Sequence, residues 1–212
     1  MIYKNLIKSL IVILLLSSCS ISFHGNLHKI EKRQLNPSEI KLIFNNDSNK
    51  ILFKTQIDLY DNNFSGLLVV KSIKENNKKI VLVTELGIKI FEFEFRDDEF
   101  EVHYCLEMLN KKAILKTLEK DLRLILMNNM VSGKAKILKD ENNLVYKLKK
   151  NKRNNYYYIN TKADKLVVIE SLSGIFKKVT IELKDYKDNY PEKINILHHN
   201  IKLNIKLKLI EI

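Results

Sequence analysis

Side chains that could bind a metal or carry out catalysis are sparse in this sequence. Glu101, His103 and Cys105 alternate along one predicted strand and offer oxygen, nitrogen and sulfur ligands. Strand residues two apart are separated by about 6.6 to 6.8 Å, so a compact three-ligand site is not expected. His198 and His199 are adjacent and would point to opposite faces of a strand, so they cannot chelate one metal together. The chain also lacks a phosphate-binding glycine loop, a nucleophile elbow and an HExxH motif, so we expect no enzyme activity, cofactor or metal.

Cys19 follows a leader that has the features of a signal peptide. Lys4 and Lys8 give the leader a positive start, residues 10–16 are an unbroken apolar run, and two serines precede the cysteine. The apolar run is too short to span a bilayer, which needs about 20 apolar residues. The alternatives are a cleaved secretory signal with a chance cysteine, or a short helical anchor.

The segment Leu16-Ser17-Ser18-Cys19 resembles the lipobox of bacterial lipoproteins. The resemblance implies that residues 1–18 are removed as a signal peptide, that Cys19 receives a thioether-linked diacylglycerol, and that the new amino terminus is acylated, for example with palmitate. Each buried methylene contributes about 0.8 kcal/mol, so two or three chains would hold the protein durably at a membrane. We expect a lipid-anchored protein of the cell envelope. Ser20 stands where some bacteria use an aspartate for inner-membrane retention, which favours the outer membrane facing the periplasm.

The net charge of +12 could indicate a nucleic-acid-binding protein, but an anchored extracytoplasmic domain meets anionic lipid head groups first. The only dense basic patch is Lys147–Arg153, and Tyr156–Tyr158 follow it closely. We interpret these residues as a rim that contacts lipid head groups, and we expect no nucleic-acid partner. Once Cys19 is lipidated only Cys105 remains, which excludes an intrachain disulfide and predicts a buried thiol.

Two periodicities organise the rest of the chain. Residues 20–37 carry few apolar side chains and read as a tether, although a short helix or strand could form near its end. From residue 39 apolar and polar residues alternate, which predicts successive antiparallel strands. The expected strands cover residues 51–59, 64–73, 80–86, 88–95, 100–104, 144–148, 155–159, 165–172, 175–183, 194–198 and 201–209.

Residues 110–131 have apolar side chains at three- and four-residue spacing, which predicts an amphipathic helix. Asn110 is the expected N-cap, and Gly133 follows the helix end. The sheet is the only large surface that can bury the apolar face of this helix. We therefore predict a mainly β fold with a central helix (α+β), in which about eleven strands form a strongly curved, unclosed half-barrel wrapped over the helix.

This order of elements resembles the bacterial lipoprotein-localisation carrier and receptor superfamily, LolA and LolB. The local similarity is Phe64 to Lys71, a glycine-containing hydrophobic strand, followed by the Leu-Gly step in Leu86 to Phe91. Phe64 stands where a tryptophan is often found in the family. The expected domains are the signal peptide at 1–18, the lipidated cysteine and flexible tether at 19–38, and a LolB-like half-barrel at 39–212.

A dry concave face of this kind could bind the acyl chains of lipoproteins or of other envelope lipids, because burial of methylene groups needs no polar motif. The alternative is a fully packed core in a structural or assembly lipoprotein of the outer membrane that docks on another envelope protein. The candidate ligand-binding residues are Leu68, Val70, Leu82, Phe91, Phe93, Leu118, Leu122 and Ile125.

Overall fold

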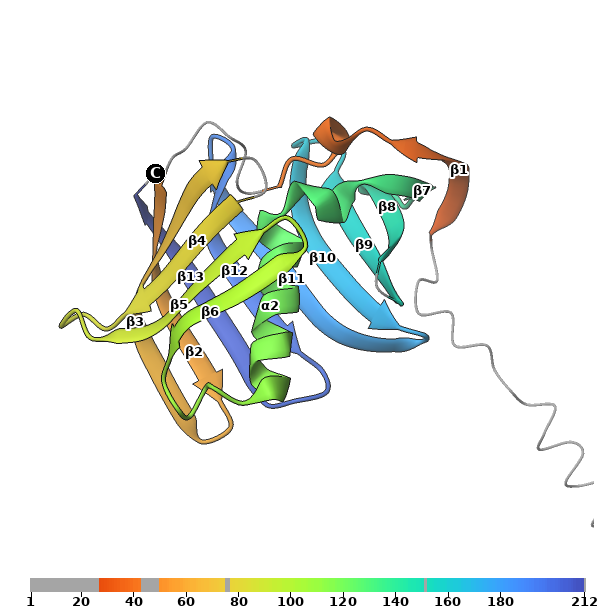
Figure 1. Ribbon diagram of the computed structural model, residues 1–212. Coiled ribbons are helices and arrows are strands. Elements are labelled where there is room, and N and C mark those ends of the chain that lie inside the picture. The colour runs from red at the N-terminus through yellow and green to blue at the C-terminus, as the bar shows by residue number, and fades with distance from the viewer. Residues whose placement is uncertain (1–26, 43–49, 75–76, 151, 212) are drawn as a thin grey trace, which may run out of the picture.

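In the described part of the chain, thirteen strands form a single antiparallel sheet that curves around one helix in this computed structural model (Figure 1). The structure describes residues 27–42, 50–74, 77–150 and 152–211, so Cys19 and the expected signal peptide lie outside the described residues. The strands are β1 (His28–Leu35), β2 (Lys50–Leu59), β3 (Asn62–Lys74), β4 (Asn77–Val83), β5 (Lys89–Arg96), β6 (Glu99–Cys105), β7 (Gly133–Lys139), β8 (Asn143–Lys150), β9 (Arg153–Asn160), β10 (Lys165–Ser173), β11 (Phe176–Lys187), β12 (Tyr190–His198) and β13 (Leu203–Glu211). The helix α2 (Lys112–Leu126) lies between β6 and β7 in the chain, and short 3-10 turns cover Pro37–Glu39 and Asn128–Val131.

The strand order is β1-β7-β8-β9-β10-β11-β12-β13-β2-β3-β4-β5-β6, which leaves β1 and β6 as the two edges. Two meanders are joined because the last strand, β13, pairs with β2 from Leu203↔Leu59 to Leu209↔Phe53 and beyond. The predicted curved and unclosed antiparallel sheet over a helix is confirmed. No helix in the described ranges is long and apolar enough to cross a membrane.

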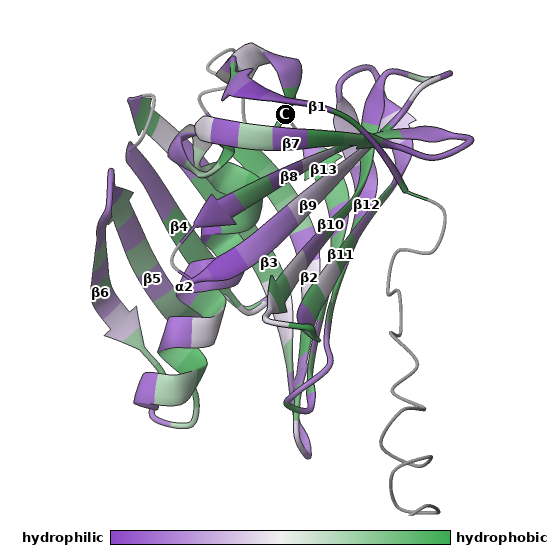
Figure 2. Cartoon of the chain, turned by 90° about the vertical axis from the view of Figure 1, so that its right-hand side faces the viewer, coloured by the Kyte–Doolittle hydropathy of each residue, from purple (hydrophilic) through white to green (hydrophobic). Residues whose placement is uncertain are grey.

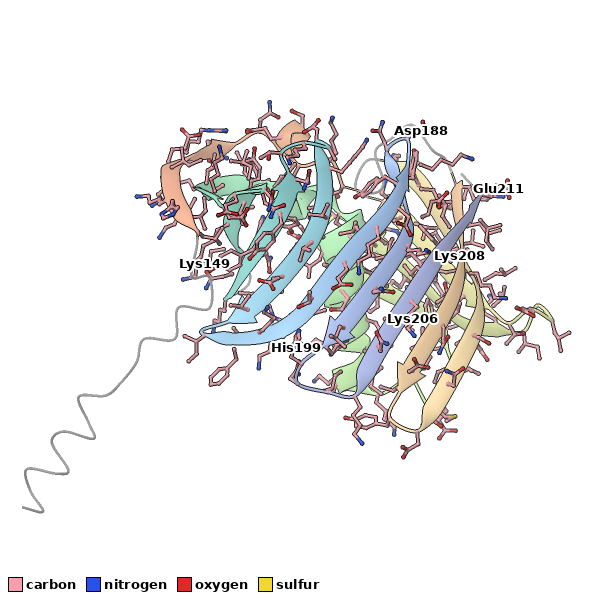
Figure 3. All side chains as sticks on the ribbon, turned by 180° about the vertical axis from the view of Figure 1, so that it is seen from behind. Lys149, Asp188, His199, Lys206, Lys208 and Glu211 are labelled. Carbon is pink, nitrogen blue, oxygen red and sulfur yellow. The ribbon has the colours of Figure 1, made fainter. Side chains whose placement is uncertain are left out.

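Apolar and polar residues alternate along the strands, so one face of the sheet is apolar and packs against α2. On β13, Leu203, Ile205 and Leu207 are buried, whereas Lys206 and Lys208 point outward from the convex face (Figure 3). Figure 2 shows hydrophobic and hydrophilic bands alternating along other strands, most clearly along β5 and β6. The expectation that 64–73 is covered on both faces is wrong, because only alternate residues of β3 are buried.

The helix is shorter than its apolar pattern predicts. It begins at Lys112 with Lys111 as N-cap, and no side chain caps it, so the expected role of Asn110 is wrong. Its backbone leaves the helical conformation at Met127, which has a φ of −108° and a ψ of 114°. Gly133 then starts β7 with a φ of +112°, a left-handed value that glycine tolerates.

The strand β7 was not expected from the sequence, and β1, with which it pairs, matches the alternative of a short strand near the end of the tether. β1 pairs with β7 from His28↔Lys139 to Leu35↔Gly133, and seven of the eight residues of β1 are exposed. A highly charged edge strand lacks apolar alternation, and its charges protect the open edge from pairing with another chain. β1 lies within residues 19–38, the range expected to be a flexible tether.

The Arg33–Glu39 ion pair ties the end of β1 to the turn that follows it. Both guanidinium Nη atoms donate to Glu39 at 2.6 Å, and the Asn36 amide donates to the same carboxylate. The Arg33 hydrogen bonds are the main cause that lowers the pKa of Glu39 from 4.5 to about 2. Because this carboxyl has a lower pKa folded than unfolded, the stability it contributes is present above pH 4.5 and is lost as the pH falls toward 2.

We therefore expect the β1 amides to exchange hydrogen faster at pH 2.5 than at pH 5, after correction for intrinsic rates, with β13 as the internal reference. The effect is modest, because a partly exposed ion pair is screened by solvent. Glu39→Gln should produce the faster exchange already at pH 5. Unchanged β1 exchange in that variant would show that the ion pair does not hold the strand.

Candidate binding site on the concave face

All eight candidate ligand-binding residues meet in the core between α2 and the sheet. They come from β3, β4, β5 and α2, and none has more than 7% of its surface exposed. The rings of Phe91 and Phe93 stack with their centroids 4.3 Å apart. Leu118, Leu122 and Ile125 project from α2 into the same cluster. The eight side chains thus form one continuous apolar surface with two sides, the sheet and the helix.

With α2 in place, this surface encloses very little empty space. The cavity between α2 and the sheet has a volume of about 20 Å³, and Leu68, Phe91, Leu118 and Leu122 are among its lining residues. Such a volume holds about one water molecule, whereas sites for small-molecule ligands occupy roughly 300 to 1,000 Å³. A hydrophobic ligand can therefore reach the concave face only if α2 moves away from the sheet.

One buried polar pair connects α2 to the floor of the sheet. The Nε2 atom of His198, at the end of β12, lies 2.8 Å from Oδ2 of Asp121 on α2, and both side chains are at most 2% exposed. Nδ1 of His198 lies 3.0 Å from the carbonyl oxygen of Leu203, so Nδ1 must carry a proton and donate it there. A second proton is then shared between Nε2 and the carboxyl. Burial raises the pKa of Asp121, and its Oδ1 atom has no hydrogen-bond partner among the described residues.

Sequence reasoning missed this pair. Asp121 lies three residues after Leu118 and four before Ile125, so it is a lone carboxyl on the apolar face of the helix. That position was the available signal, because a buried carboxyl needs a partner. The structure agrees that adjacent histidines face apart: His198 is buried, whereas His199 is exposed and hydrogen-bonded to Thr180.

Arg123 holds the other side of α2. Its two Nη atoms donate to the backbone carbonyl groups of the β5–β6 turn at Asp97, Asp98 and Glu99, over 2.7 to 3.0 Å. Its Nε donates to Glu119 one turn earlier at 3.0 Å. Polar contacts therefore attach the helix to both parts of the sheet, to β12 through Asp121 and to the β5–β6 turn through Arg123.

Glu101, His103 and Cys105 do not share one face of β6 as expected, because a β-bulge interrupts the strand. Glu92 pairs with Tyr104 but Phe93 pairs with Val102, so His103 is the extra residue and Cys105 turns toward the core opposite Phe91. Cys105 is half-buried, and burial raises the pKa of its thiol to about 11, which makes it a poor nucleophile at neutral pH.

Glu94 joins Glu101 and His103 in place of the cysteine, and one ligand atom of each lies within 4.8 Å of the others. Arg96 already binds both carboxylates, at 2.7 Å to Glu94 and 3.3 Å to Glu101. Hydrogen bonds from Arg96 and then His103 lower the pKa of Glu94. The arrangement is a hydrogen-bonded ion network that spans β5 and the edge strand β6.

The tyrosine part of the expected head-group rim is not at the surface. Tyr156 and Tyr157 are buried, and the hydroxyl of half-buried Tyr158 donates to Glu170 at 3.1 Å. The expectation of a tyrosine rim is therefore wrong. The basic residues of the same segment do remain accessible along the ends of β8 and β9.

No protein-family model and no curated protein matches this sequence. Among solved structures, the chain is similar to the LolA superfamily protein NE2245 from Nitrosomonas europaea, with 11% identity, 82% of this chain and 89% of that chain covered, and a TM-score of 0.54. It also matches a domain from Vibrio parahaemolyticus named for outer membrane lipoprotein sorting, with 6% identity, 76% and 82% of the two chains covered, and a TM-score of 0.40. The first likeness shows that this chain has the fold of a LolA superfamily protein, an unclosed antiparallel sheet with a helix on its concave side.

Proposed function

We propose that this protein is a non-enzymatic, lipid-anchored lipoprotein of the cell envelope whose concave face binds a hydrophobic ligand, such as the acyl chains of lipoproteins or of envelope lipids. The observation that carries the proposal is a continuous apolar surface covered by a single amphipathic helix. Each methylene group that enters such a surface contributes about 0.8 kcal/mol. The LolA-like fold supports the proposal, because it provides a curved sheet whose concave face is covered by α2.

When a ligand binds, the concave face of the sheet exchanges its apolar contacts with α2 for apolar contacts with the ligand. When α2 moves away, acyl chains take the place of its apolar residues Ile114, Leu118, Leu122 and Ile125, so the loss of apolar burial is small. The polar contacts of Asp121 and Arg123 are not replaced by an acyl chain, and their rupture is the main cost of opening. Those two residues therefore set the balance between the closed and the ligand-bound arrangement.

Exposed apolar residues at one end of the sheet support a membrane setting. The β2–β3, β4–β5 and β10–β11 connections share this end because neighbouring strands alternate in direction. They carry Tyr60, Leu86, Ile88, Ile175 and Phe176, all exposed, and Leu86 has 88% of its surface accessible. Apolar side chains displayed on separate hairpin tips suit contact with a lipid surface or with an apolar protein partner.

Native mass spectrometry of the full chain after gentle detergent extraction tests the proposed function. We expect lipid to copurify with the protein, and we expect the bound fraction to fall when excess monoacylglycerol is added as a competitor. Repeated isolation of a lipid-free chain that also takes up no added acyl probe would contradict a carrier role.

The closed packing also favours a second candidate, a structural or assembly lipoprotein that keeps its core filled and docks on another envelope protein. The cavity of about 20 Å³ is the specific observation behind this candidate. In the same native spectra it predicts a lipid-free domain in a stoichiometric complex with a protein partner.

Cys19 is proposed as the lipidation site, and Cys19→Ser is expected to move the protein from the membrane fraction to the soluble fraction. Loss of two or three acyl chains removes about 0.8 kcal/mol for every buried methylene. Cys105→Ser is the matched control, because it removes the other cysteine of the chain and should leave the protein with the membranes. Incorporation of labelled palmitate and separation of inner from outer membranes provide the readout. A Cys19→Ser protein that still fractionates with membranes would contradict the lipobox interpretation.

A further inference from the structure

A basic cleft lies beside α2, on the side of the helix that does not face the core. It has a volume of about 530 Å³ and is bounded by α2, the β5–β6 turn and the end of β8. A smaller hollow of about 40 Å³ shares four of its lining residues and extends toward the start of β9. Figure 1 shows these elements around the open side of the sheet, with α2 between β6 and β9. The volume falls within the range of about 300 to 1,000 Å³ typical of ligand sites.

Four cationic side chains converge on the cleft and the adjoining hollow from three elements, α2, β8 and β9, and Arg153 lines the smaller hollow. Lys116 and Lys120 lie one turn apart on α2, and Lys150 and Arg153 flank the β8–β9 turn. The described residues offer Arg153 neither a hydrogen bond nor an ion pair, although it is half-buried. Among the described residues, Lys150 forms a hydrogen bond only with Ser132 Oγ, at 3.5 Å.

The charges at this site repel one another. Burial is the main cause that lowers the pKa of Lys120, and the positive charges of Arg153 and Lys116 lower it further. Burial also lowers the pKa of Arg153. The buried Asp121 carboxyl opposes both shifts, and Glu119 also opposes that of Lys120, but burial outweighs them, so an anion in the cleft would stabilise the cationic forms further.

The acidic groups near the cleft are already engaged. Glu119 accepts from Arg123 Nε at 3.0 Å, and Asp98 accepts from the Asn129 amide at 3.1 Å. Arg123 is likewise committed to the β5–β6 turn and is not free to bind a ligand. The lining of the larger cleft carries four cationic side chains, Lys116, Lys120, Arg123 and Lys150, against these two carboxylates, so an excess of positive charge remains.

The inner hollow combines a polar pair with apolar side chains. Ser171 Oγ donates to Asn155 Oδ1 at 2.8 Å, and both residues are buried at the floor. Leu124 and Met130 supply apolar surface in the same hollow. A ligand with a charged head and an apolar body would match both kinds of surface.

We propose that this cleft binds the phosphate-bearing head group of an anionic amphiphile. The Arg153 guanidinium can donate two parallel hydrogen bonds to a phosphate, and the three lysines act as point charges around it. The cleft has room for a head group larger than one inorganic ion, and its apolar side chains receive the atoms that follow the phosphate. The inference rests on the proposed function in one respect, because it takes the proposed hydrophobic ligand to be an amphiphile.

The test uses the full chain in phosphatidylcholine nanodiscs and isothermal titration calorimetry at low salt. The probes are dihexanoyl phosphatidic acid, its zwitterionic analogue dihexanoyl phosphatidylcholine, and inorganic phosphate. We expect phosphatidic acid to bind most tightly. Arg153→Gln combined with Lys120→Gln should weaken that binding at least about tenfold, since each charged hydrogen bond lost is worth a factor of about 10 or more. This variant should remain folded, because it removes charges that repel each other.

The matched control is Lys206→Gln combined with Lys208→Gln, which removes the same charge from a second lysine-lined hollow on the convex face. The control should bind phosphatidic acid like the unmodified chain. Equal weakening in both variants would overturn the proposal, because binding would then reflect only the overall charge. Inorganic phosphate binding as tightly as phosphatidic acid would overturn the head-group assignment.

A fluorescent, uncharged monoacylglycerol added to the same samples separates the two proposals. If it binds but Arg153→Gln with Lys120→Gln leaves phosphatidic acid binding unchanged, the cleft assignment fails and the proposed function stands. If it does not bind while phosphatidic acid binding depends on Arg153 and Lys120, the cleft assignment stands and the acyl-binding function fails.

Discussion

Asp121→Ala is expected to lower the free energy of unfolding by about 3 to 5 kcal/mol, the usual effect of removing one partner from a buried ionic pair. The substitution leaves the His198 ring facing an empty space with no acceptor for its Nε2 atom, and it detaches α2 from β12. Urea unfolding at pH 7 measures the loss. His198→Ala and the double variant complete a double-mutant cycle, in which strongly non-additive losses are expected.

Replacing both partners together with leucine should recover most of the lost stability, since buried ion pairs are often no more stable than well-packed apolar residues. Additive single losses would contradict a direct coupling between Asp121 and His198. The comparison thus separates the stabilising free energy of the Asp121–His198 pair from the free-energy cost of burying one member without its partner.

The same pair provides a test of how the concave face opens. Asp121→Asn keeps the shape of the side chain but removes its charge, so it should weaken the attachment of α2 and speed the uptake of a fluorescent monoacylglycerol. Lys112→Gln, in the exposed first turn of α2, is the control and should leave uptake unchanged. A less stable Asp121→Asn chain with unaltered uptake would mean that the pair serves stability alone.

Gly66→Ala is expected to destabilise the chain by about 3 kcal/mol, because β3 and β4 approach each other too closely at this point for a methyl group. A Cβ on Gly66 would lie 1.9 Å from the carbonyl oxygen of Val83 and 2.9 Å from the Cα of Thr84. Both atoms are backbone, so two paired strands would have to separate. The β4–β5 hairpin, which carries Leu86, would lose its fixed position.

Gly174→Ala is the matched control for this prediction. Its φ of +61° makes a side chain unfavourable, but nothing lies within 4 Å of the added Cβ, so a loss of about 1 kcal/mol is expected. Urea unfolding of the two variants gives the comparison. If Gly66→Ala lost no more stability than Gly174→Ala, the close approach of β3 to β4 would not be a constraint on the fold.

Elements with a clear side-chain period could be read from the sequence. Apolar residues alternate with polar ones along β2, β5 and β13, and they recur at three- and four-residue spacing along α2. These patterns indicate which face of each element packs into the core, and they are clear because all four elements are buried against one dominant core. The pairing of β1 with β7 left no such record, because an exposed edge strand is held by backbone hydrogen bonds.

The candidate apolar face was largely predictable for the same reason, since residues that alternate toward one side of a curved sheet must meet the helix that covers it. The close packing of α2 against this face could not be predicted, because it depends on how the side-chain volumes of the helix and the strands fit together in three dimensions. The bulge at His103 also escaped sequence reasoning, since one extra residue in a strand reverses every later side chain without changing the pattern of residue types.

The sequence by itself determined a mainly β fold and one amphipathic helix, because each depends on neighbouring residues and their spacing, and it contains the lipobox-like segment Leu16–Cys19 on which the proposed lipidation rests. Only the tertiary structure decided which polar groups meet. Asp121 and His198 are 77 positions apart, and the cationic cleft combines Lys116 and Lys120 of α2 with the distant β8–β9 segment. Such contacts are set by the way a curved sheet brings remote strands around one helix, which no local pattern of residues encodes.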